Sequence, residues 1–145
     1  MGDIIKMSTD RLTIRAPNGA PDEDGVLRLE FEASNESFSA RRATVTGGKA
    51  IEQLVATLSG FPRRIPDQVV FEAGTPADVA LTFSTLRNTG QCGVLVSIKT
   101  SPVSSHGLKI ENSASFWVMF EPGDLDTFTK RLENIFESGE ARLGK

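Results

Sequence analysis

Cysteine and histidine are almost absent from this chain of 145 residues, which holds only Cys92 and His106. A zinc site of the usual kind draws several ligands from these two residue types. A disulfide within the chain would need a second cysteine. We therefore expect no bound metal and no other cofactor, and the single thiol fits a reducing compartment.

Long apolar runs and an excess of positive charge are missing as well. No stretch approaches the roughly 20 apolar residues that cross a bilayer, and the first residues lack the basic-then-apolar order of a signal peptide. Sixteen basic residues face nineteen acidic ones, which gives a net charge of -3 at pH 7. No overall positive field therefore draws the chain to nucleic acid. We expect a cytoplasmic protein that binds neither membranes nor nucleic acid.

Catalytic motifs are equally scarce. A Ser-His-Asp triad would have to use His106, whose serine-rich loop carries no other mark of an activated nucleophile. The run from Thr46 to Ala50 lacks the GxxxxGK[ST] spacing of a phosphate loop and is interpreted as the entry to a helix. Cys92 opens a strand pattern, where a buried structural thiol is the common case. We therefore expect the protein not to be an enzyme.

The apolar residues that are present follow the periods of strands and helices. With 39% apolar and 24% charged residues, the chain is long enough to bury one core, so we expect a single domain over 1–145. Alternation predicts strands at 11–15, 26–33, 37–45, 69–73, 79–86, 93–100 and 114–120. In the third of these, the inward side chains would be Phe38, Ala40, Ala43 and Val45.

Two segments instead follow the period of an amphipathic helix, at about 48–60 and about 123–137. Gly60 and Pro62 would end the first helix. Pro122 would mark the entry to the second helix, and Asp124 would lie at its positive end. The fold class is therefore α+β, a mostly antiparallel sheet of about 6–7 strands with both helices packed on it. We expect a flexible leader at 1–10 and a flexible tail at 138–145.

The strand at 114–120 is apolar on both faces. Phe116 and Phe120 share one face, and Trp117 and Met119 share the other. Such a pattern predicts a central strand, or one covered on both sides, with Trp117 in the core. A second subunit could supply the cover, so a homodimer is one expectation.

The polar loops supply the residues that could bind a partner. Three acids stand together in the loop at 16–25, a basic doublet follows the first helix, and the histidine stands in the loop at 101–110. We name these residues as candidate contacts to a protein partner: Asp22, Glu23, Asp24, Arg63, Arg64 and His106.

The order of elements also carries a resemblance. A helix that closes in Phe61-Pro62, a strand that begins at Val69, and the segment from Ser115 to Leu125 resemble small bacterial proteins of unknown function. That group includes immunity proteins of the WapI type, which are encoded beside polymorphic toxins. The likeness spans roughly residues 11–137. It implies a non-enzymatic protein that neutralises a toxin domain by covering it, and it assigns no site residues.

Two functions remain open from the sequence. In the first, the chain is a protein-binding module of the immunity type, whose loop acids complement a basic toxin surface. In the second, it carries a small apolar ligand in a cavity between a curved sheet and the C-terminal helix, lined by Phe83, Phe116, Phe120 and Phe128. We favour the binding module, because a cavity needs apolar residues that do not pack against one another, whereas the apolar stripes of both helices are expected to pack on a sheet.

Overall fold

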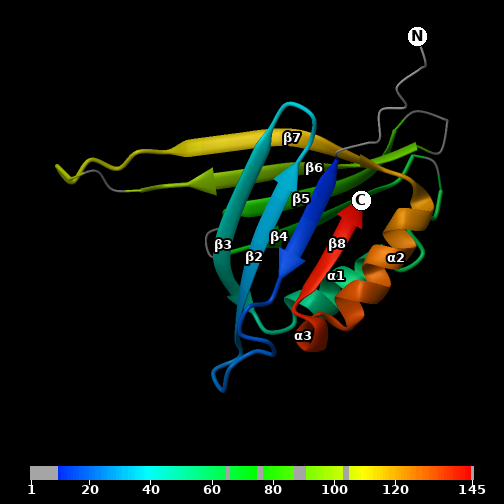
Figure 1. Cartoon of the computed structure of the whole chain (residues 1–145), viewed down its shortest axis with the longest axis horizontal. Helices are drawn as coiled ribbons and strands as arrows, with labels where there is room; N and C mark the ends of the chain where they lie inside the picture. The colour runs from blue at the N-terminus through cyan, green and yellow to red at the C-terminus, as the bar shows by residue number, and fades with distance from the viewer. Residues whose placement is uncertain (1–9, 65, 75–76, 87–90, 103–104, 145) are drawn as a thin grey trace, which may run out of the picture.

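The computed structural model describes residues 10–64, 66–74, 77–86, 91–102 and 105–144. In these residues the chain forms eight strands and three helices (Figure 1). The strands make two antiparallel sheets of four strands each. The structure thus confirms the α+β class and the predominance of antiparallel strands, and it divides the expected sheet into two.

The first sheet has the strand order β3-β2-β1-β8. Its strands alternate between a buried face and a polar face, as β2 shows with Leu27, Leu29 and Phe31 all buried between charged neighbours. A strand with this period-two pattern covers a core on one side and meets water on the other. The strands span Arg11–Arg15 (β1), Val26–Ser34 (β2), Ser39–Gly47 (β3) and Glu140–Gly144 (β8).

The second sheet is the expected meander, with the order β4-β5-β6-β7. Leu81 and Phe83 of β5 and Val94 and Val96 of β6 point inward and are fully buried. The strands span Gln68–Ala73 (β4), Val79–Leu86 (β5), Gln91–Thr100 (β6) and Asn112–Phe120 (β7).

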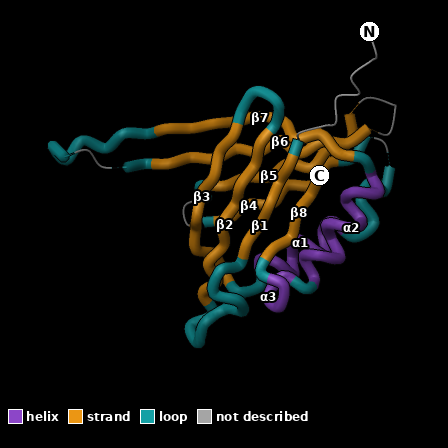
Figure 2. The backbone as a smooth tube through the Cα atoms, in the orientation of Figure 1, coloured by secondary structure: helices purple, strands orange, loops and turns teal. Residues whose placement is uncertain are grey.

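The two sheets lie face to face with their strands crossing, and the helices lie together along one side (Figure 2). The helices span Ala50–Leu58 (α1), Pro122–Glu133 (α2) and Ile135–Ser138 (α3). Helix α2 packs along β8 and against α1, which in turn contacts β4. One hydrophobic core therefore runs between the sheets and under the helices.

Local signals account for the helix ends. Gly60 has a φ of +81°, a conformation that suits glycine just beyond a helix, and it follows α1 as expected. Pro122 opens α2, and the backbone N–H of Glu121 donates to Asp124 Oδ2 at 3.1 Å. The expected second helix is interrupted at Asn134, so its last turn forms α3.

The segment predicted to be a flexible tail forms β8 instead. Ala141 and Leu143 are fully buried, and the strand pairs with β1 along its whole length. The sequence prediction was wrong here because a five-residue strand has too short a pattern to stand out. Residues 1–9 of the expected leader lie outside the described residues.

Strand β7 is an edge strand, not a central one. Trp117, expected in the core, is 37% exposed on the outer face of the second sheet. A Cβ added to Gly93 would lie 3.1 Å from both the Trp117 ring and the Met119 sulfur. The two side chains therefore cover Gly93 on the neighbouring strand. This packing explains why the outer face of β7 carries apolar residues although that face is not buried in the core.

The inward face of β3 also differs from the prediction. Its inward positions are Ala40, Arg42, Thr44 and Thr46, whereas Ala43 and Val45 face outward. Phe38 precedes the strand and is 63% exposed, although its ring stacks on Phe116 of β7 at 6.0 Å. Ala40 faces the core as predicted. The prediction was wrong for Ala43 and Val45, because they stand an odd number of residues from Ala40 and alternation therefore places them on the opposite face.

Strands β6 and β7 continue beyond the edge of the first sheet as a long hairpin arm (Figure 1). We call residues 99–102 and 105–113 the arm. The Ile110 backbone N–H donates to the Pro102 carbonyl at 3.0 Å, so the two sides of the arm stay paired beyond Asn112. The arm places polar and apolar side chains beside the otherwise uncovered edge at β3.

Candidate binding surface

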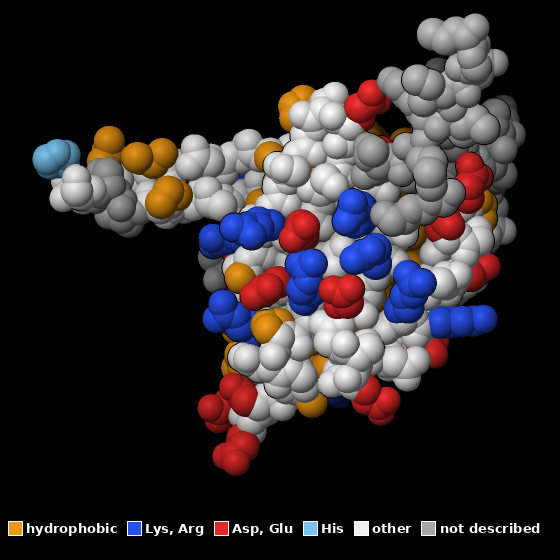
Figure 3. All heavy atoms as spheres, viewed as in Figure 1, with side chains coloured by type: hydrophobic (Ala, Val, Ile, Leu, Met, Phe, Trp, Pro, Cys, Tyr) orange, Lys and Arg blue, Asp and Glu red, His pale blue; other side chains and the backbone are white. Residues whose placement is uncertain are grey.

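The outer face of the first sheet is densely charged, and we call it the arginine face. Register brings its residues into rows: Arg41 opposes Glu32, and Arg15 lies between Glu30 and Glu140. Positive and negative side chains alternate across the sheet in Figure 3. The arginines outnumber the glutamates, in contrast to the net negative chain. The charged members are Arg11, Arg15, Arg28, Arg41, Arg142, Glu30, Glu32 and Glu140.

Ion pairs fix the middle of this face. Arg15 reaches Glu32 Oε2 at 3.1 Å and Glu140 Oε2 at 3.2 Å, and Arg142 lies 3.7 Å from Glu140 Oε1. The hydrogen bond to Glu32 raises the pKa of Arg15, and Glu140 adds to the effect. Half-exposed pairs of this kind stabilise a fold by only about 0–1 kcal/mol each. Their effect is to hold the guanidinium groups in a defined arrangement on the surface.

Two arginines of this face keep an unused donor. Within the described ranges, Arg11 Nε and Arg142 Nε are buried atoms without a hydrogen-bond partner. The Arg131 side chain, by contrast, donates to the Arg142 carbonyl at 3.0 Å. A guanidinium presents several N–H donors in a planar fork that matches a carboxylate. Because these two Nε atoms are buried, an acidic partner would instead meet the exposed side chains of this face, such as Arg28 and Arg41.

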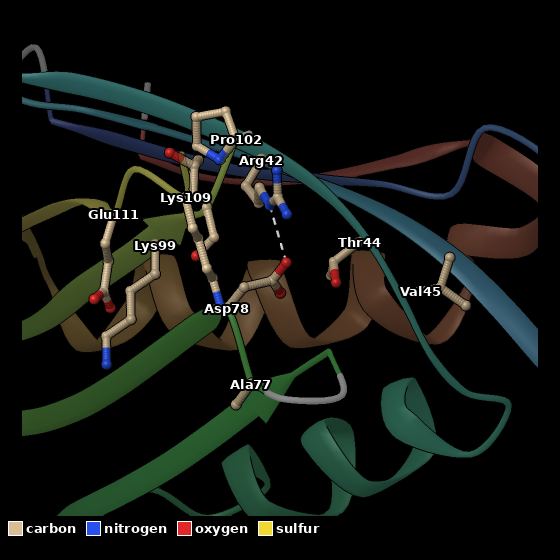
Figure 4. Close-up of a pocket in the computed structure, with 11 residues that line it drawn as sticks. Arg42, Thr44, Val45, Ala77, Asp78, Lys99, Pro102, Lys109 and Glu111 are labelled. Atoms are coloured by element: carbon tan, nitrogen blue, oxygen red, sulfur yellow. Dashed lines mark hydrogen bonds and ion pairs between the residues drawn. The ribbon is translucent and has the colours of Figure 1, made fainter. Parts of the chain in front are cut away.

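A polar groove of about 780 Å³ opens beside the arginine face, between β3 and the base of the arm (Figure 4). Cationic and anionic side chains line it together, with Lys99 and Lys109 on the arm and Thr44 and Val45 on β3. The full lining is Arg42, Thr44, Val45, Ala77, Asp78, Lys99, Thr100, Ser101, Pro102, Lys109 and Glu111. The mixed charge suits a polar partner surface better than an apolar ligand.

An ion pair between the two sheets forms the floor of the groove. Arg42 Nε of β3 donates to Asp78 Oδ2 at 2.9 Å, and the Asp78 side chain is only 19% exposed. The Asp78 backbone is held on both sides, because its N–H donates to Ala73 and its carbonyl accepts from Lys99. The second carboxylate oxygen, Oδ1, is buried and has no partner among the described residues. Asp78 thus has one free acceptor next to the groove.

The structure separates the residues that the sequence singled out. Asp22, Glu23 and Asp24 lie in the β1–β2 loop, which forms an acidic projection at the lower end of Figure 3. Asp22 has a structural part there, because its Oδ1 accepts from the backbone N–H groups of Asp24 and Val26 at 2.9 Å each. Glu23 and Asp24 are exposed and free to meet solvent or a partner.

The other three candidates lie elsewhere. Arg63 and Arg64 are exposed in the loop between α1 and β4, where the Arg63 N–H donates to Asp67 Oδ2 at 2.8 Å. His106 is exposed at the far end of the arm, as the pale blue side chain in Figure 3 shows. The loop acids, the basic doublet and the histidine therefore form no common site.

The phenylalanines named for a ligand cavity lie in the core. Phe83 and Phe128 are fully buried, Phe116 and Phe120 nearly so, and Phe83 meets Phe120 edge to face at 6.3 Å. Cys92 is fully buried too, and desolvation, with a smaller effect of Glu121, raises the pKa of its thiol. A thiol in such a setting is a poor nucleophile.

The arginine face was missed in the sequence, although part of its signal is visible there. Alternation in the predicted strand at 26–33 puts Arg28, Glu30 and Glu32 on one face. Arg142 fell in the segment assigned to a flexible tail, and only the pairing of β8 with β1 brings it next to Thr13. Strand order, which the sequence does not state, assembles these residues into one surface.

No family model, curated protein or solved structure matches this chain. Within residues 10–64, 66–74, 77–86, 91–102 and 105–144, no group of three or more His, Cys, Asp or Glu side chains is placed to hold a metal ion. Among those same residues, no helix has the length and apolar character to cross a membrane. Function must therefore be argued from the surface itself.

Proposed function

We propose that this chain is a non-enzymatic protein-binding module that covers its partner with the arginine face. The observation that carries the proposal is an ordered sheet surface rich in arginine, on which Arg28 and Arg41 are exposed. Arginine is enriched at protein interfaces, where its fork binds carboxylates through paired hydrogen bonds. The partner surface is accordingly rich in acidic side chains.

The immunity role is the biological form of this proposal. A protein that neutralises a toxin domain by occlusion needs a rigid, broad surface and no catalytic group. A four-stranded sheet supplies such a surface, because its backbone pairing fixes the positions from which the side chains project. The exposed acids Glu23 and Asp24 would meet any basic rim around the partner's acidic centre. The packed phenylalanine core gives a ligand carrier no comparable support.

The test is co-expression with the protein encoded by the adjacent gene, followed by affinity measurement and a growth assay. The variant Arg28→Glu/Arg41→Glu reverses two exposed charges of the arginine face. We expect it to weaken binding by about tenfold or more, with most of the loss in the association rate at low salt. The matched control is Arg63→Glu/Arg64→Glu, which makes the same charge change in the α1–β4 loop.

Binding that is lost equally in both variants would point to net charge and contradict an interface on the arginine face. Failure of the adjacent gene product to bind, together with no rescue of growth, would reject the immunity role.

A further inference from the structure

We propose that two copies of this chain join edge to edge through the start of β7 and the arm residues before it, around a two-fold axis at Asn112. The pairing would continue the four strands of each second sheet into one sheet across both copies. This inference goes beyond the binding proposal and does not rest on it, because the arginine face belongs to the other sheet and stays exposed in the dimer.

The first observation is an open strand edge. Backbone groups of β7 point alternately toward β6 and away from it. The Trp117 carbonyl and the Met119 N–H point away, since they bond Asn35 Nδ2 at 2.9 Å and Asp10 Oδ2 at 2.8 Å. Ser113 and Ser115 share this direction, because they stand two and four residues from Trp117.

Only part of this edge is covered. Side chains of Asn35 and Asp10 bond the edge at Trp117 and Met119. In the part of the chain that the structure describes, no hydrogen bond reaches the outward backbone groups of Ser113. Natural sheets protect such edges or use them to pair with another strand. The open segment therefore begins just where the side-chain cover stops.

The second observation is an exposed apolar stripe beside the open segment. Ile110 is 42% exposed and Leu108 is 67% exposed. Both lie in the arm before β7, at even positions like Phe116. The hydrogen bond from Ile110 to Pro102 continues the β6–β7 pairing there, so by alternation they share the face that is buried further along β7. Phe38, which stacks on Phe116, is 63% exposed at the end of this stripe. A strand that pairs with the edge would also cover the stripe.

The segment that fits this edge is the same one in a second copy: the start of β7 together with the arm residues that lead into it. Antiparallel pairing around Asn112 places Glu111 opposite Ser113, and Lys109 opposite Ser115, of the second copy. All four residues direct their backbone groups outward, so these pairs can exchange hydrogen bonds. No like charges face each other in this register.

The same register matches the apolar residues. Leu108 of one copy lies opposite Phe116 of the other, next to the exposed Phe38 ring. Ile110 lies opposite Ala114. One symmetric contact therefore shields the apolar stripe of both copies at once, which a single foreign strand would not do.

Neighbouring registers fit less well. A two-fold axis at Glu111 would place the two Glu111 side chains directly opposite each other. An axis at Ser113 would pair Lys109 with Trp117, whose carbonyl already accepts from Asn35. The axis at Asn112 keeps the two Glu111 side chains apart. Its hydrogen-bonded pairs, Glu111 with Ser113 and Lys109 with Ser115, stop short of Trp117.

The mass in solution tests the dimer directly. Sedimentation velocity and light scattering over the micromolar range should show twice the chain mass of 15.7 kDa. Ser113→Pro removes an outward N–H without breaking the β6–β7 ladder, and we expect it to weaken the dimer by about tenfold or more. Ser113→Ala keeps the N–H and is expected to leave the dimer intact. Far-UV circular dichroism verifies that both variants fold.

A disulfide tests the register independently of any folding defect. Asn112→Cys would face its own copy across the axis, within the Cα separation of about 4.4–6.8 Å that a disulfide requires. We expect rapid crosslinking of Asn112→Cys under mild oxidation, because the two thiols would lie next to each other. The native Cys92 is fully buried and would not compete. Glu111→Cys is the control, because in this register the two residues at 111 stand too far apart.

Either of two results would overturn the proposal. One is a monomer at every concentration without Asn112→Cys crosslinking. The other is a dimer whose affinity is unchanged by Ser113→Pro and that crosslinks through Glu111→Cys as readily as through Asn112→Cys.

Discussion

At the residue scale, a few polar side chains fix loops that the core does not reach. Asp67 closes the loop before β4: its Oδ2 accepts from the Arg63 N–H at 2.8 Å and its Oδ1 from the Gln68 N–H at 2.9 Å. Its own N–H donates to Thr85 Oγ1 at 2.7 Å. The backbone hydrogen bond from Arg63 is the main cause that lowers the pKa of Asp67, and Arg64 contributes through its charge.

This lowered pKa predicts a pH dependence of stability. A carboxyl whose pKa is lower in the folded state stabilises the fold above its unfolded pKa, and the contribution is lost as pH falls through the folded value. The free energy of unfolding should therefore fall below about pH 4. We expect Asp67→Asn to be less stable at pH 7 and to lose less stability on acidification. Urea titrations between neutral and acidic pH measure both effects.

Glu72→Gln is the control for this prediction, because Glu72 is exposed on β4. Equal acid sensitivity of Asp67→Asn and the wild type would contradict the assigned role of the Asp67 carboxylate.

At the element scale, β8 shows how much a short strand can contribute. It pairs with β1, packs against α2 and buries Ala141 and Leu143 completely. Gly139 has a φ of +88°, which lets the chain turn from α3 into the strand. The strand therefore forms one edge of the first sheet, where α2 packs against it, and its inward side chains complete the core there.

Truncation of a buried side chain measures this contribution. We expect Leu143→Ala to lower the free energy of unfolding by about 2–5 kcal/mol, because a cavity replaces well-packed atoms. Val70→Ala removes apolar atoms from a side chain that is 56% exposed on β4, and it should change stability by no more than about 0.5 kcal/mol. Denaturant midpoints of both variants give the comparison. A Leu143→Ala variant as stable as the control would show that β8 is not docked in solution.

At the scale of the whole molecule, two sheets of different surface character share one core. The first presents the arginine face, and the second presents Trp117 opposite Leu95 and Met119 opposite Gly93. Polar contacts that join the sheets at their margins include Arg42 to Asp78, Asn35 to Trp117 and Asp10 to Met119. These links orient the sheets relative to each other and shape the groove between β3 and the arm.

A double-mutant cycle on Arg42 and Asp78 measures one of these links. Arg42→Met leaves a largely buried carboxylate without its partner, and we expect a loss of about 1–3 kcal/mol in unfolding free energy. In the double variant Arg42→Met/Asp78→Asn, part of that loss should be recovered, with a coupling energy of about 0.5–3 kcal/mol. Strictly additive effects in urea unfolding would show that the pair contributes nothing to joining the sheets.

The sequence by itself determined the local elements, because periodicity and capping residues are local signals. The alternation of Leu27, Leu29 and Phe31 predicted β2, and Gly60 predicted the end of α1, and the structure confirms both. The α+β class followed from these elements. None of this required knowledge of which strands are neighbours.

Tertiary structure alone decided which of these elements meet. Strand order made β7 an edge, placed Trp117 on the surface and turned residues 140–144 into a strand beside β1. Pairing between residues more than a hundred positions apart, such as Thr13 with Arg142, then built the arginine face. The physical reason is that alternation defines two faces of a strand, whereas burial of one of them depends on what the rest of the chain packs against it.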